Sequence, residues 1–130
     1  MKKDSNMRKV IGMGETILDI LFKNRQPVAA VPGGSSFNAI ISTGRVGVPC
    51  HFIGSTGADE VGQMIVDFMH ANGVSTQYFE QTEEKSAVSL AFLDEAGDAH
   101  YSFYKPSVKC PGEKSHPAFA QDDVLLFGSY

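Results

Sequence analysis

The chain has 130 residues, of which 42% are hydrophobic and 20% are charged, and its formal net charge is −4. This length is enough for one domain with a hydrophobic core, and the composition is ordinary for a globular protein. The negative charge, without a run of Lys and Arg, argues against nucleic-acid binding. No apolar run is long enough to span a membrane, and the N-terminus lacks the apolar core of a signal peptide. We therefore expect a cytoplasmic protein with neither a nucleic acid nor a membrane as partner.

Short apolar runs that alternate with helical patterns organise the first half of the chain. The spacing of Phe37, Ile40 and Ile41 predicts one helix. A second helix is predicted to begin after an N-cap at Asp59 and to end at Asn72, which precedes a glycine. An order of strands and helices that alternate favours a parallel sheet in an α/β fold. The apolar runs predicted as strands are 9–14, 17–23, 28–31 and 50–55.

The second half of the chain has a different pattern. Apolar and polar residues alternate in 86–93 and again in 99–105, and the intervening 94–98 is rich in Gly and acidic residues. This pattern predicts an antiparallel hairpin, which inside an α/β chain suggests a separate flap or lid. The continuous apolar run at 123–129 predicts another buried parallel strand.

Nucleotide and metal motifs are incomplete. Gly12 and Gly14 begin a pattern like that of a dinucleotide-binding loop, but Ile17 stands where the third glycine belongs. Cys50 and Cys110 show no metal-type spacing, and we expect both thiols to be reduced and packed. The four histidines share no spacing pattern, so we expect no metal site.

Polar groups in apolar or glycine-rich surroundings are the candidates for ligand binding. Asp19 interrupts an apolar strand pattern, and a buried carboxylate is costly unless it is paired or hydrogen-bonded; the alternative is a solvent-facing strand residue. Gly33 and Gly34 allow close approach of the backbone to a ligand at the start of a helix, where N–H groups bind anions or oxygens. Asn38 offers both a donor and an acceptor to a hydroxyl group. The alternative for this stretch is an ordinary capped helix, and no P-loop lysine follows it.

The motifs, taken in order, resemble the N-terminal part of the PfkB, or ribokinase-like, family of carbohydrate kinases. The stretches that carry the resemblance are "GETILD", "GGSSFNAIISTGRVG", "GSTGADEVGQMI" and "FYK". The resemblance implies that residues 1–130 form part of an α/β three-layer sandwich with a mostly parallel sheet. It also implies a small β lid made by about 17–31 and 86–105.

The same resemblance implies roles for individual residues. Asp19 and Asn38 would hold sugar hydroxyls, the glycine pair would lie beside the sugar, and the aromatic and basic end of the hairpin would close over it. Lys105 stands where fructokinase-like members have arginine. A lysine cannot form the bidentate hydrogen bonds of an arginine, so the case for bidentate recognition of the substrate is weaker. The implied substrate-binding residues are Asp19, Gly33, Gly34, Asn38, Phe103 and Lys105.

The implied function is ATP-dependent phosphorylation of a sugar hydroxyl, most simply that of fructose, with ATP and Mg²⁺ as cofactors. The family's catalytic base and most of its ATP site belong to a C-terminal half whose motif is not found in this chain, so we expect no catalytic residue here and no activity of the chain alone. Family members often pair their lids, which implies a homodimer. The alternatives are a kinase of the same fold for a nucleoside or a sugar acid such as 2-keto-3-deoxygluconate, and a non-catalytic sugar-binding or interaction protein.

Overall fold

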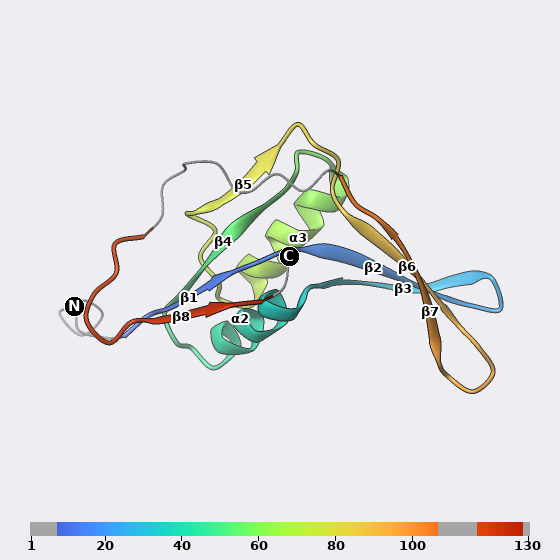
Figure 1. Ribbon diagram of the computed structural model, residues 1–130, viewed down its shortest axis with the longest axis horizontal. Coiled ribbons are helices and arrows are strands. Elements are labelled where there is room, and N and C mark those ends of the chain that lie inside the picture. Colours follow the sequence, from blue (N-terminus) through green and yellow to red (C-terminus); the bar gives the residue numbers. More distant parts are fainter. Residues whose placement is uncertain (1–7, 107–116, 129–130) are drawn as a thin grey trace.

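The computed structural model describes residues 8–106 and 117–128, and these form two β-sheets and two α-helices (Figure 1). The main sheet has the strand order β5-β4-β1-β8, and each neighbouring pair is parallel. Apolar runs between turns explain why three of these strands form here. Their bounds are Val10–Met13 for β1, Cys50–Gly57 for β4, Phe79–Thr82 for β5 and Val124–Phe127 for β8.

The second sheet extends away from the main sheet on one side of the molecule (Figure 1). Its strand order is β3-β2-β6-β7. The two outer pairs are antiparallel, whereas the central pair, β2 with β6, is parallel. The strands are β2 (Ile17–Lys23), β3 (Gln26–Gly33), β6 (Val88–Leu93) and β7 (Ala99–Tyr104).

Both helices, α2 (Ser35–Arg45) and α3 (Glu60–Ala71), contact the main sheet. Asp59 is the N-cap of α3, since its Oδ1 accepts a hydrogen bond of 2.8 Å from the Gly62 N–H, and Asn72 is the C-cap, as the sequence predicts. The residues buried between the helices and the sheet are Phe37, Ile40, Ile41, Cys50, Phe52, Ile65, Met69 and Val74.

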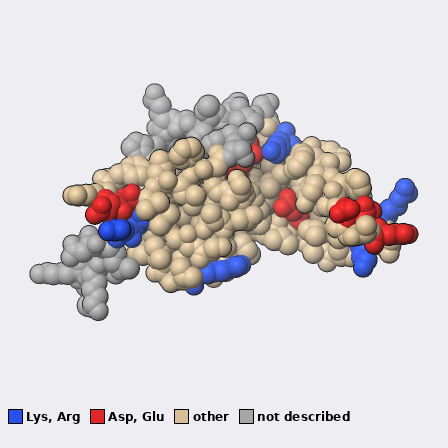
Figure 2. Space-filling view, turned by 60° about the horizontal axis from the view of Figure 1, so that its bottom comes forward, with Lys and Arg blue, Asp and Glu red and all other residues tan. Residues whose placement is uncertain are grey.

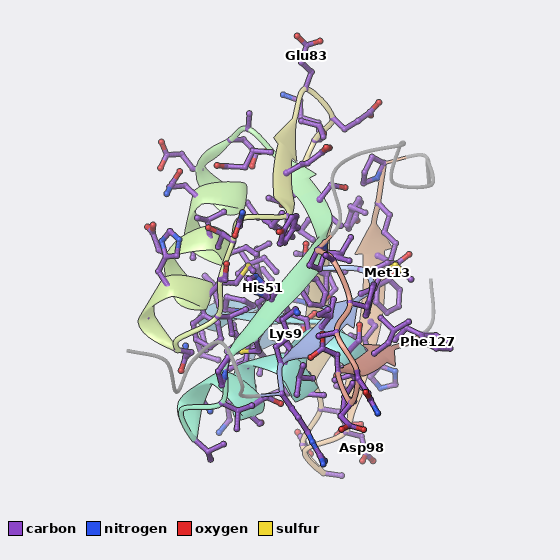
Figure 3. All side chains as sticks on the ribbon, turned by 90° about the vertical axis from the view of Figure 1, so that its left-hand side faces the viewer. Lys9, Met13, His51, Glu83, Asp98 and Phe127 are labelled. Carbon is purple, nitrogen blue, oxygen red and sulfur yellow. The ribbon has the colours of Figure 1, made fainter. Side chains whose placement is uncertain are left out.

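Figure 3 shows Met13 and Phe127 on the side of the main sheet that faces away from both helices. Phe127 is 67% exposed there. Two of the three layers expected for the fold, a sheet and one helix layer, are therefore formed by the described residues. No helix among those residues is long and apolar enough to cross a membrane.

The positions of the predicted strands and helices are confirmed, and one strand was missed. The prediction that the strand at 123–129 is buried is wrong: Val124 and Leu125 of β8 are 49% and 45% exposed, because β8 lies at the edge of the main sheet among the described residues. Strand β5 has the sequence FEQT, with one apolar residue among polar ones, so no apolar run marked it. It is an edge strand, held by its pairing with β4. Cys50 is buried and not part of a disulfide, while Cys110 lies outside the described residues.

Candidate functional site

The N-terminus of α2 lies beside Gly14 and Gly128, at the ends of β1 and β8, where the strand order of the main sheet reverses. Strand β4 pairs with one edge of β1 and β8 with the other, and α2 contacts all three strands. In open α/β sheets, ligands bind at such a switch point, beyond the carboxyl ends of the strands. Gly34 is the N-cap residue of α2 and provides no side-chain hydrogen bond. The first N–H groups of the helix are thus left without a side-chain cap at the expected position of a ligand.

Asp19 lies in a row of side chains that crosses all four strands of the second sheet. The register pairs it with Val31 on β3 and with Ser89 on β6, and pairs Ser89 with Phe103 on β7. Directly opposed residues share one face of a sheet. Tyr101 lies two residues from Phe103 and shares that face, and the rings of the two aromatics stack at 5.8 Å. The predicted residues Asp19 and Phe103 are therefore on one face.

The Asp19 carboxylate is half-buried and hydrogen-bonded. Its Oδ1 accepts a hydrogen bond of 2.5 Å from the hydroxyl of Ser89, which is fully buried. Its Oδ2 faces Gly33, where a Cβ atom would lie only 2.7 Å from that oxygen. Asp19 is thus partly buried and held by a partner, and the absence of a side chain at Gly33 leaves space beside Oδ2.

Gly34 meets a second, separate constraint. Its φ of 127° is a conformation that residues with a Cβ rarely adopt. A Cβ atom at this position would also clash with the carbonyl oxygen of Glu15, in the loop between β1 and β2. The two glycines of the predicted motif therefore act differently: Gly33 makes room for a carboxylate, and Gly34 lets the backbone turn into α2 against that loop.

Lys105 binds a carboxylate of the chain itself. Its Nζ lies 3.0 Å from Oε2 of Glu15 and 5.3 Å from the centre of the Phe103 ring. Exposed pairs of this kind contribute only about 0–1 kcal/mol. The pair joins the end of β7 to the loop that contacts Gly34, so the contact brings Lys105 and the glycine pair to the same region.

Asn38 lies in the first turn of α2 and is exposed. Its backbone N–H makes the first helical hydrogen bond, to the Gly34 carbonyl at 2.8 Å. Its side-chain amide makes no hydrogen bond to the described part of the chain. Both its donor and its acceptor are therefore open to a ligand, as the candidate role requires.

A hydrogen-bonded anchor joins the second sheet to the core just before β6. Asp59 accepts hydrogen bonds from the Ser86 N–H at 3.0 Å and from the Ser86 hydroxyl at 2.6 Å. Burial raises the pKa of Asp59, but the hydrogen bonds from Ser86 and Gly62 outweigh it and hold the pKa below its ordinary value. The helix cap thus also fixes the start of the strand that carries Ser89.

Among residues 8–106 and 117–128, no group of three or more His, Cys, Asp or Glu side chains is placed to hold a metal ion. The candidate site offers instead one open carboxylate oxygen, one amide and an aromatic face. Those groups suit a ligand with hydroxyl groups and apolar C–H surfaces.

Comparison with known proteins decides the family. The model of the pfkB family carbohydrate kinases matches residues 7–129. The chain belongs to this family. Two curated relatives are an aminoimidazole riboside kinase of Salmonella typhimurium, 28% identical over 95% of the chain, and the probable fructokinase-4 of Arabidopsis thaliana, 26% identical over 92% of it. The chain spans 40% of the length of each.

Solved structures agree with this assignment. A fructokinase from Xylella fastidiosa with bound ATP is 25% identical to this pfkB-family chain, with a TM-score of 0.66 over 77% of the chain and 34% of the fructokinase. The mixed α/β fold with a mostly parallel main sheet is therefore that of the ribokinase-like sugar kinases, as the sequence predicts.

Ser89 was missed as a site residue. Asp19 and Ser89 each stand as a polar residue within an apolar strand, and that shared feature is the signal in the sequence. Using it would have required the parallel pairing of β2 with β6, which joins segments 70 residues apart. Local patterns predict hairpins but not pairings between distant strands.

Proposed function

We propose that this chain forms the sugar-binding part of a cytoplasmic, ATP-dependent carbohydrate kinase that phosphorylates a sugar hydroxyl, most simply that of fructose. The observation that carries the proposal is the Asp19 carboxylate, which has one oxygen held by Ser89 and the other open beside Gly33. Membership of the pfkB family and a fructokinase structure with bound ATP support the reaction class.

In this proposal each predicted residue has a binding role. Asp19 accepts a hydrogen bond from a sugar hydroxyl, and the Asn38 amide orients a second one. Gly33 and Gly34 form the floor of the site. Phe103 covers an apolar side of the sugar, and Lys105 holds the end of β7 over the site through Glu15. ATP and Mg²⁺ would be held outside this set of residues.

Measurements of sugar affinity in two variants test the proposal. A hydrogen bond to a charged group contributes about 1.5–3 kcal/mol and a neutral one about 1 kcal/mol. We therefore expect Asp19→Asn to weaken fructose binding more than Asn38→Ala does, while both variants stay folded. Titration followed by NMR or calorimetry measures both affinities. Equal affinities for wild type and both variants would remove these residues from the site.

A nucleoside is the second candidate substrate, because the relative with 28% identity is a riboside kinase. A ribose-containing ligand offers the same hydroxyl groups to Asp19, together with a base that the stacked pair Tyr101 and Phe103 can cover. Titration of the same protein with fructose, ribose and a riboside discriminates the two substrates. Tighter binding of the riboside than of both free sugars would favour the nucleoside.

A further inference from the structure

Ser89 is the only polar residue in the sequence of β6 and is fully buried. The register places it directly between Asp19 on β2 and Phe103 on β7. We propose that Ser89 is a positioning residue whose hydroxyl holds one oxygen of Asp19, so that the other oxygen is oriented toward the substrate. This role rests on the proposed function, in which Asp19 binds a sugar hydroxyl.

The direction of the hydrogen bond follows from the two groups. An ionised carboxylate only accepts hydrogen bonds, so the Ser89 hydroxyl is the donor. The distance of 2.5 Å from Oγ to Oδ1 is in the range of a charge-assisted bond. Such a bond restricts rotation of the carboxylate and uses one of the two lone pairs of Oδ1. Oδ2 accepts no hydrogen bond from the described residues, so it is the oxygen oriented for recognition.

The open oxygen has a neighbour that keeps it open. A side chain at position 33 would begin 2.7 Å from Oδ2 and would fill the space beside it. Ser89 and Gly33 thus flank Asp19 from two different strands, one by donating a hydrogen bond and the other by leaving space. A single oriented oxygen selects a hydroxyl donor in one direction, which a freely rotating carboxylate does not do.

A purely structural role for Ser89 makes a different prediction. If the hydroxyl only satisfied a buried polar group, its loss would lower stability, and any effect on sugar affinity would be independent of Asp19. If Ser89 acts through Asp19, its loss matters only while the carboxylate is present. A double-mutant cycle on sugar affinity separates these two cases.

The experiment uses the 130-residue chain, titrated with D-fructose and D-ribose and followed by NMR. The variants are Ser89→Ala, Ser89→Thr, Asp19→Asn and the double variant of Ser89→Ala with Asp19→Asn. Ser102→Ala is the matched control, since Ser102 is exposed on the same sheet and pairs with Leu90 on its opposite face. Thermal unfolding confirms that each variant is folded.

We expect Ser89→Ala to weaken sugar binding on the order of tenfold. Ser89→Thr, which keeps the hydroxyl, restores most of that loss, and Ser102→Ala binds like wild type. In the Asp19→Asn background, Ser89→Ala changes the affinity by less than about twofold. Without any sugar, the carboxyl carbon resonance of Asp19 shifts in Ser89→Ala and stays in place in Ser102→Ala.

Three results overturn the positioning role and leave the proposed function standing. The first is wild-type affinity in Ser89→Ala, and the second is an equal loss in both Asp19 backgrounds. The third is an unmoved Asp19 carboxyl resonance in Ser89→Ala, because the hydrogen bond itself is then absent. Failure of wild type to bind any sugar, or affinity that is independent of Asp19, overturns the proposed function and the positioning role together.

Discussion

Asp19 shows how the role of one carboxylate depends on its immediate neighbours. A half-buried carboxylate in an apolar strand is costly unless it is hydrogen-bonded, and Ser89 supplies that bond. Gly33 then leaves space beside its second oxygen, while Gly34 lets the backbone turn into α2. The chemistry of this site at the residue scale is one oriented acceptor oxygen with backbone, not side chains, beside it.

The first prediction concerns Gly34→Ala. The backbone conformation at this residue, with φ of 127°, costs about 1–3 kcal/mol for a residue with a Cβ, and the Cβ also meets the Glu15 carbonyl. We expect a lower free energy of unfolding by at least that amount, measured by urea denaturation. Gly97→Ala is the control, because it has φ of 85° but nothing within 4 Å of its Cβ. Equal losses in both variants would show that the contact with Glu15 contributes nothing.

At the scale of elements, the loop before β6 connects the two sheets. Asp59 begins α3 and accepts two hydrogen bonds from Ser86, two residues before β6 begins. One carboxylate therefore couples a helix of the core to a central strand of the second sheet. The strand that carries Ser89 is positioned by the core through this contact.

The second prediction concerns this anchor. Loss of an N-cap costs about 0.5–2 kcal/mol. Asp59→Ala also removes the two hydrogen bonds that Ser86 donates, although the Ser86 hydroxyl keeps its contacts with Thr56 and Gly57, so we expect a loss at the upper end of that range. Because the folded-state pKa of Asp59 lies below its ordinary value of 3.8, its contribution is present above that value and is lost as the pH falls through the folded-state pKa. Asp59→Asn should therefore lose less stability on acidification than wild type does.

Urea denaturation at neutral and acidic pH measures both effects on stability. The matched control is Asp67→Asn, since Asp67 lies on the exposed side of the same helix and, among the described residues, accepts a hydrogen bond only from Gln63, at 2.8 Å. An acid dependence in Asp59→Asn that equals the wild-type dependence would contradict the assigned role of the charge.

At the scale of the whole molecule, the second sheet has two contrasting faces and extends from the main body (Figure 1). Tyr101 and Phe103 are 55% and 59% exposed on the face that carries Asp19. Leu90 and Phe92 lie on the opposite face, where Phe92 stacks on Phe22 at 4.8 Å. Figure 2 shows small groups of acidic and basic side chains, with no large surface patch of a single charge on the face that it presents.

The third prediction is that the chain forms a homodimer through the second sheet, because exposed aromatic surface favours association. Because Tyr101 is exposed, we expect Tyr101→Asp to weaken the dimer, so that the average molar mass in light scattering falls toward that of one chain. Leu90→Asp tests the other face, where Leu90 is already half-buried. A wild-type mass of one chain at every workable concentration would contradict the dimer, and a loss of the dimer only in Leu90→Asp would move it to the other face.

The fourth prediction concerns activity. Phosphoryl transfer requires a positioned nucleotide, a metal ion and a base, whereas the residues of the proposed site would bind only the acceptor. We expect the 130-residue chain to bind sugar and to release no ADP from ATP with fructose or ribose. A coupled ADP-release assay measures this, with Asp19→Asn as the control. Turnover above the blank that disappears in Asp19→Asn would refute the prediction.

Local pattern in the sequence determined most of the elements, the caps and the glycine pair. Alternation, helical spacing and N-cap chemistry act over a few residues, so they predicted β1, β2, both helices and the hairpin of β6 and β7. Pairing between distant segments was decided only by the tertiary structure. The surroundings of Asp19 depended on β6 lying parallel to β2, which also brought Ser89 to it. The ion pair between Lys105 and Glu15 likewise joins two segments that are distant in sequence. Contacts between strands far apart in sequence depend on the packing of the whole chain, which no local pattern records.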